Sequence, residues 1–192
     1  GIRSLEDIKK LLNAGADKVS INSAAVKNPN FIKEAAETFG SSTISVSVET
    51  NKIDNEYLVF TENGRNLHNI SVIHWIEQIQ SLGAGEVILT SISNEGLGLG
   101  LDLELLNKVR NLVNIPLVIN GGVGKIDDIK NLISNFKVSG VAVGSAFHYY
   151  YLNSFIKDKQ ISGNKDFTLG HVENTKYNCF SIKKLNQEIV KL

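Results

Sequence analysis

Two short apolar runs that end in glycine constrain the fold of this chain more than any other feature. They are Ile115–Gly124 (IPLVINGGVG) and Val141–Ser145 (VAVGS), and a helical pattern lies between them. Such runs, bounded by Gly or Pro and separated by a helix, predict buried parallel strands in βα units. Glycine lets backbone N–H groups approach a ligand, and the next helix directs its positive N-terminus there. The pair of turns predicts a phosphate site, although glycines that only form tight turns would give the same pattern.

Composition limits the classes of protein to which this chain can belong. It has 192 residues, 42% of them hydrophobic and 21% charged, which is enough for one sizeable core. The formal net charge of +0 gives no general attraction to nucleic acid or to an anionic membrane. No apolar run is long enough to span a bilayer, and no secretory signal pattern is present. Cys179 is the only cysteine, which excludes an intramolecular disulfide or thiolate zinc site and fits a cytoplasmic protein.

The remaining pattern alternates strands and helices. Further strands are expected at residues 18–22, 43–49 and 86–90, with helices between them, and residues 57–61 are expected to form a strand of a surface excursion. This alternation predicts an α/β fold with a parallel sheet. Ser45, Ser47 and Glu49 alternate with aliphatic residues, which favours a (β/α)8 TIM barrel with a polar interior over a doubly wound open sheet.

A complete barrel needs about 250 residues, so strands 3 to 8 are expected here with their helices. The chain begins at Gly1 without Met, and we expect an upstream segment to be missing. Residues 1–151 are predicted to form the partial, phosphate-binding barrel. Residues 152–192 are predicted to be a C-terminal extension of uncertain structure, in which residues 181–192 could form an amphipathic helix.

Several motifs in one order resemble the cyclase subunit family of imidazole glycerol-phosphate synthase. They are Gly1-Ile-Arg, residues 15–29 (GADKVSINSAAVKNP), residues 83–91 (GAGEVILTS) and Phe147-His148. The resemblance runs from Gly1 to about Tyr149. It implies a (β/α)8 barrel that uses no metal or redox cofactor and closes an imidazole ring in histidine biosynthesis, with ammonia from a glutaminase partner. The substrate would be a ribulosyl-formimino-aminoimidazole carboxamide that carries two phosphates.

The resemblance also implies positions for the substrate and for the reacting groups. One phosphate would bind at Gly1, Asn22 and Ser23; the other end of the substrate would bind at Thr90, Glu95, Gly96, Gly122, Gly144 and Ser145. The family uses two aspartates as general acid and base. One lies outside this chain, and the other matches Glu49, a longer carboxylate that could instead be a strand end reaching solvent.

At the opposite end of the barrel, the resemblance implies an ammonia gate at Lys18 and Glu86, with Asp17 at the glutaminase interface. An ordinary salt bridge at the barrel bottom would place Lys18 and Glu86 in the same way. Ser93, Glu95 and Leu97 depart from the family pattern. Two alternatives therefore stay open: an ammonia-channelling partner of a sugar amidotransferase that makes acetamidino sugars for bacterial surface polysaccharides, and a non-catalytic remnant.

Overall fold

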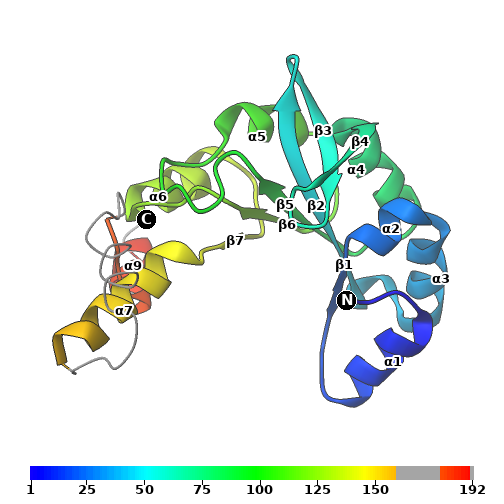
Figure 1. The fold of residues 1–192 in the computed structure, drawn as a ribbon, viewed down its shortest axis with the longest axis horizontal. Coiled ribbons are helices and arrows are strands. Elements are labelled where there is room, and N and C mark those ends of the chain that lie inside the picture. The colour runs from blue at the N-terminus through cyan, green and yellow to red at the C-terminus, as the bar shows by residue number, and fades with distance from the viewer. Residues whose placement is uncertain (159–177, 191–192) are drawn as a thin grey trace.

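A computed structural model describes residues 1–158 and 178–190 of the chain (Figure 1). Within them, a seven-stranded sheet is covered by helices. The strands are β1 (Val19–Ile21), β2 (Ile44–Ile53), β3 (Glu56–Thr61), β4 (Asn66–Ser71), β5 (Glu86–Ser91), β6 (Leu117–Asn120) and β7 (Gly140–Ala142). The helices are α1 (Leu5–Asn13), α2 (Ser23–Lys27), α3 (Asn30–Phe39), the 3₁₀ helix η1 (Ser41–Thr43), α4 (Val72–Ser81), α5 (Leu103–Val109), α6 (Ile126–Asn135), α7 (Ser145–Asp158) and α9 (Ile182–Ile189).

The sheet confirms the predicted α/β class and parallel order. Strands β1, β2, β5, β6 and β7 pair in that sequence, and every one of these pairings is parallel. Helices lie between consecutive strands along the chain, and Figure 1 shows them along the outside of a curved sheet. This arrangement is that of part of a (β/α)8 barrel.

The central strand β2 has two different faces, as its alternating sequence predicts. Ile44, Val46 and Val48 are fully buried and belong to the main hydrophobic core. That core also holds Trp75, Ile76 and Ile79 of α4 and Phe31, Ile32 and Ala35 of α3. The polar residues Ser45, Ser47 and Glu49 therefore face away from these helices.

The excursion after β2 is a hairpin, and its second strand was not predicted. β2 continues beyond its parallel partners and pairs antiparallel with β3, and β3 pairs with β4. Residues 62–64 form the turn between β3 and β4, and Glu62, Asn63 and Gly64 all have positive φ. The short helix α2, which directly follows β1, was also not predicted.

The C-terminal part of the chain adds two helices. α7 begins at Ser145 and continues to Asp158, across the predicted boundary at residue 151. The amphipathic helix expected within residues 181–192 is present as α9. A second core cluster joins Phe180 and Leu185 to Val123, Ile129 and Ala146, and Lys130 of α6 forms an ion pair with Glu188 at 2.6 Å. Residues 180–189 therefore pack against the last described βα unit.

Candidate active site

A row of side chains crosses the sheet near the carboxyl ends of the parallel strands. Glu49 of β2 is in register with Thr90 of β5, Thr90 with Asn120 of β6, and Asn120 with Ala142 of β7. The Asn120 amide donates a hydrogen bond to the Thr90 hydroxyl at 3.1 Å. Three inter-strand spacings of about 4.8 Å separate β2 from β7, so the row spans roughly 14 Å along the curved sheet.

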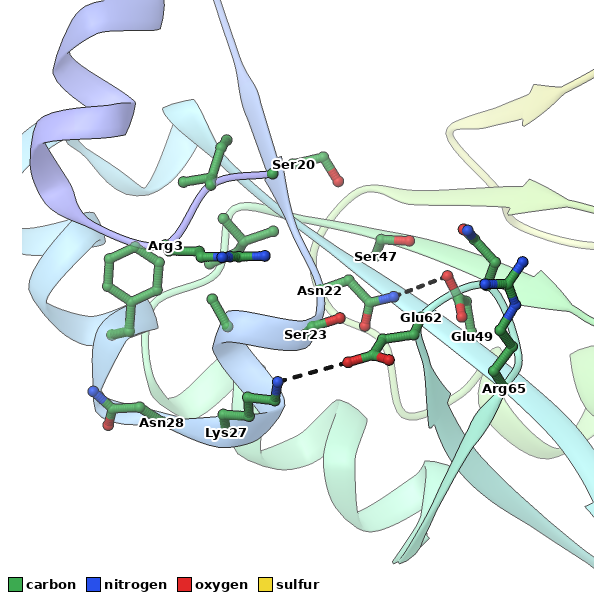
Figure 2. A pocket seen from close by; sticks show the side chains of 16 residues that line it. Arg3, Ser20, Asn22, Ser23, Lys27, Asn28, Ser47, Glu49, Glu62 and Arg65 are labelled. Atoms are coloured by element: carbon green, nitrogen blue, oxygen red, sulfur yellow. Dashed lines mark hydrogen bonds and ion pairs between the residues drawn. The ribbon is translucent and has the colours of Figure 1, made fainter.

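Glu49 is held at both carboxylate oxygens by donors from two other elements. The Asn22 side-chain amide, directly after β1, donates to Oε1 at 2.9 Å (Figure 2). The backbone N–H of Gly64, in the β3–β4 turn, donates to Oε2 at 2.8 Å. Glu49 is partly buried rather than extended into solvent. The carboxylate therefore has a fixed position and orientation, which a general acid or base requires.

A cavity of about 1080 Å³ surrounds this carboxylate. Gly1, Asn22 and Ser23 line it, as do Ser47, Glu49 and the hairpin turn. Three cationic side chains, Arg3, Lys27 and Arg65, also line the cavity, and Lys27 forms an ion pair with Glu62 at 3.7 Å. The side-chain oxygen of Asn22 is buried and has no hydrogen-bond partner among the described residues.

A second, smaller cavity of about 70 Å³ lies at the other end of the row. It is lined by the residues that we name the glycine cradle, namely Glu95, Gly96, Gly98, residues 120–123 and residues 142–145. The two glycine turns that were predicted to form a phosphate site thus meet here, with the first residue of α7 beside them. Its volume is about twice the share of one water molecule in the liquid, ~30 Å³, so it suits one small polar group rather than a whole substrate.

Close backbone approach explains why glycines form this cradle. A Cβ atom added to Gly122 would lie 2.1 Å from the Gly100 oxygen, and one on Gly124 would lie 2.0 Å from the Gly98 oxygen. The Gly100 N–H donates to the Gly122 oxygen at 2.8 Å, and the Asn94 amide donates to the Gly100 oxygen at 2.9 Å. Gly144 is different, because a Cβ atom there would meet nothing within 4 Å. Gly144 therefore borders open space at the cradle.

Lys18 and Glu86 meet near the amino ends of the strands. Their side chains form an ion pair at 2.7 Å, in which 47% of the Lys18 side chain and 17% of the Glu86 side chain are exposed. Glu86 lies four residues before Thr90 on β5, so the pair is roughly 13 Å from the level of Glu49 at ~3.3 Å per residue. Asp17, next to Lys18, is exposed. The geometry agrees with a gate and equally with a salt bridge that closes one end.

Several residues of this site were not identified from the sequence. Gly64 and Asn120 hold the polar row in place, and Arg3 and Arg65 line the larger cavity. Asn120 was detectable, because it lies two residues after Val118 on the same strand and therefore faces the same side of the sheet. Gly64 was not detectable, because its backbone N–H makes the contact and nearly every residue type has such a donor. In the described part of the chain, no group of three or more His, Cys, Asp or Glu residues could hold a metal ion.

Comparison with known proteins identifies relatives of this chain. The model of the histidine biosynthesis protein family matches residues 1–153. The chain is 42% identical over 149 residues to the imidazole glycerol phosphate synthase subunit HisF of Natranaerobius thermophilus. This match covers 78% of the chain and 59% of that relative, so the chain spans well under two thirds of the relative's length. Of the helices that the structure describes, none has the length and apolar character needed to cross a membrane.

Proposed function

This chain belongs to the histidine biosynthesis protein family, and we propose that it forms the larger part of an imidazole glycerol-phosphate synthase cyclase subunit. The observation that carries this proposal is the polar row that joins a fixed carboxylate, Glu49, to the glycine cradle. Ring closure on a substrate with a phosphate at each end needs both elements: an acid–base group at the reacting atoms and a phosphate site that fixes the substrate beside it.

In this proposal Glu49 moves the protons of ring closure. Both of its oxygens accept hydrogen bonds, from Asn22 and Gly64, so the side chain is placed as a proton acceptor toward the cavity. The second acid–base group would come from a segment outside residues 1–192. Thr90 and Asn120 continue the polar row and would contact the substrate between its two ends.

The two phosphates would bind at opposite ends of the row. Gly122, Gly144 and Ser145 offer backbone N–H groups, and Ser145 begins a helix of 14 residues, whose N-terminus attracts anions. Gly96 and the Glu95 side chain border the same cavity. At the other end, Gly1, Asn22 and Ser23 would bind the second phosphate, and the cationic side chains of the larger cavity would attract it.

Glu49→Gln in the full-length protein is the direct test of this function. The amide keeps the size of the side chain but cannot accept a proton, so we expect ring closure with added ammonium to fall by about 10²- to 10⁴-fold. Affinity for the bisphosphorylated substrate, measured by calorimetry, should change little. Ring closure at the wild-type rate in this variant would remove Glu49 from the chemistry. Formation of an acetamidino sugar instead would support the sugar amidotransferase alternative.

The ion pair of Lys18 and Glu86 suggests how ammonia would enter. We propose that this pair forms the gate, with Asp17 on the rim that contacts a glutaminase subunit. Lys18→Ala in the complex should leave glutamine hydrolysis intact while less of the nitrogen reaches the product, and added ammonium should bypass the defect. The measured quantity is the ratio of glutamate formed to nitrogen incorporated. If this ratio stays at one, Lys18 and Glu86 are an ordinary salt bridge.

A further inference from the structure

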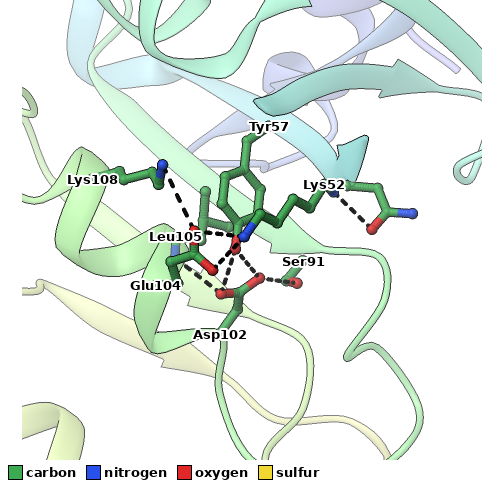
Figure 3. Close-up of polar contacts among 8 residues, drawn as sticks. Lys52, Tyr57, Ser91, Asp102, Glu104, Leu105 and Lys108 are labelled. Atoms are coloured by element: carbon green, nitrogen blue, oxygen red, sulfur yellow. Dashed lines mark hydrogen bonds and ion pairs between the residues drawn. The ribbon is translucent and has the colours of Figure 1, made fainter. Parts of the chain in front are cut away.

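A partly buried carboxylate outside the candidate site, Asp102, connects three separate elements. Asp102 accepts hydrogen bonds at both oxygens from the Tyr57 hydroxyl, at 2.9 and 3.1 Å, and at Oδ2 from the Ser91 hydroxyl at 3.0 Å (Figure 3). It also accepts from the backbone N–H of Leu105 at 2.9 Å, as the N-cap of α5. We name Tyr57, Ser91 and Asp102 the Asp102 cluster. It joins the hairpin strand β3, the end of β5 and the start of α5.

The two hydroxyl residues of the cluster are shielded from water. Tyr57 is 5% exposed and Ser91 is 2% exposed. Burial, and next the hydrogen bond to Asp102, raise the pKa of the Tyr57 hydroxyl far above its usual range, so it remains a donor at physiological pH. Lys52 forms hydrogen bonds with both oxygens of Glu104, and the Lys52 and Lys108 ammonium groups lie 6.0 and 5.9 Å from the centre of the Tyr57 ring. These side chains cover the ring from the solvent side.

The two residues Tyr57 and Asp102 each lie on a segment that leads to one end of the candidate site. From Tyr57, strand β3 runs directly into the turn whose Gly64 N–H holds the Glu49 carboxylate. From Asp102, residues 92–101 carry the Glu95–Gly96 part of the glycine cradle. The Gly100 N–H of this loop donates a hydrogen bond to the Gly122 oxygen, which lies in the turn after β6. The cluster is therefore the hydrogen-bonded connection between the hairpin and the loop.

We propose that the Asp102 cluster is a positioning device that fixes the β3–β4 hairpin relative to loop 92–101. By doing so it holds Glu49 and the glycine cradle at a constant spacing, so that one ligand can engage both. The first part concerns the fold alone. The second part rests on the proposed function, because it concerns a ligand that reaches from the cradle to the acid–base carboxylate.

Tyr57→Phe in the full-length protein tests the first part without any ligand. It removes one hydroxyl, keeps the ring, and leaves Asp102 with one donor fewer. Loss of a hydrogen bond to a charged group should raise local opening by roughly tenfold or more. We expect amide hydrogen exchange to accelerate by this factor at both Gly64 and Gly100, while amides of α3 keep their rates. Tyr151→Phe, at a residue that is 43% exposed, is the matched control and should change neither amide. Unchanged exchange, or acceleration at only one of the two amides, would overturn the coupling.

Two ligands of different length test the second part. Glycerol phosphate can occupy either proposed phosphate site but cannot reach from one to the other, whereas the bisphosphorylated substrate spans the row. Tyr57→Phe should leave the affinity for glycerol phosphate unchanged but weaken binding of the long ligand and lower kcat for ring closure, each by roughly tenfold. Equal loss for both ligands would show general damage and overturn the positioning role, as would no loss for either. If the wild-type protein does not close the ring, the proposed function fails, and the exchange comparison still decides the coupling.

Discussion

The glycine cradle makes a quantitative prediction through two of its glycines, Gly122 and Gly144. Gly122 has a φ of +102°, and a Cβ atom there would lie 2.1 Å from the Gly100 oxygen and 3.0 Å from the Asn94 Cβ. Gly122→Ala therefore forces the backbone to move and breaks the 2.8 Å hydrogen bond from Gly100 to Gly122. Left-handed strain of about 1–2 kcal/mol and a lost hydrogen bond of about 0.5–1.5 kcal/mol together lower the free energy of unfolding by roughly 1.5–3.5 kcal/mol. A domain with a typical stability of about 5–15 kcal/mol remains folded after this loss.

Gly144→Ala is the matched control from the same cavity. Its new methyl group meets nothing within 4 Å, and its φ is not positive, so we expect the free energy of unfolding to stay within about 1 kcal/mol of the wild-type value. Urea unfolding measures this free energy, and calorimetry with glycerol phosphate measures binding at the two proposed phosphate sites, of which the cradle is one. Gly122→Ala should lose most of the binding at the cradle, and Gly144→Ala should keep it. Equal stability and affinity in the two variants would refute the close-approach argument for the cradle.

Three further predictions concern the rest of the described chain. The pKa of the Tyr57 hydroxyl is raised in the folded state, so the contribution of this hydroxyl to the free energy of unfolding is complete below pH ~10 and is lost as pH rises further. In urea unfolding between pH 8 and 11, Tyr57→Phe should therefore show a smaller loss of stability with rising pH than the wild type. Phe180 is 2% exposed and lies edge-on to Phe147 at 5.3 Å between ring centres. Phe180→Ala should lower the free energy of unfolding, measured by thermal unfolding, by about 3–5 kcal/mol, and Phe180→Leu should lower it less. In the described part of the chain β1 and β7 each have one sheet neighbour, so residues 1–192 alone should self-associate; a single monomeric boundary in sedimentation velocity would contradict this.

Strong periodicity made the barrel strands predictable from the sequence. The alternation in residues 43–49 predicted both a strand and the direction of its polar side chains, and the aliphatic runs before Gly121 and Gly144 predicted two further strands. By contrast, β4 has the sequence NLHNIS, in which polar residues interrupt the apolar ones, and only its pairing with β3 makes it a strand. The helix α2 has five residues, too few for a helical period to show. Weak local preference at both places is overridden by tertiary contacts.

The hydrogen bonds that hold the candidate site could not be predicted in the same way. Asn22 and Glu49 are 27 residues apart, and Tyr57 and Asp102 are 45 residues apart. Asp102 directly precedes α5 and caps it, since its side chain accepts from the Leu105 N–H. Its two hydroxyl partners come from β3 and β5, and their approach depends on how the hairpin folds back over the sheet. A cap is a local feature of sequence, whereas this connection is a feature of topology.

Glu49 shows how these long-range contacts decide what a sequence change means. When the sequence is compared with the family pattern alone, a glutamate in place of an aspartate suggests a displaced carboxylate and a slower reaction. In the structure, the longer side chain meets one donor from the end of β1 and another from the hairpin turn, and both oxygens are engaged. The position of the carboxylate is thus set by Asn22 and Gly64 rather than by side-chain length alone. Because the hairpin that carries Gly64 is itself tied to Asp102 through Tyr57, the geometry of the candidate acid–base group depends on a residue that does not line its cavity.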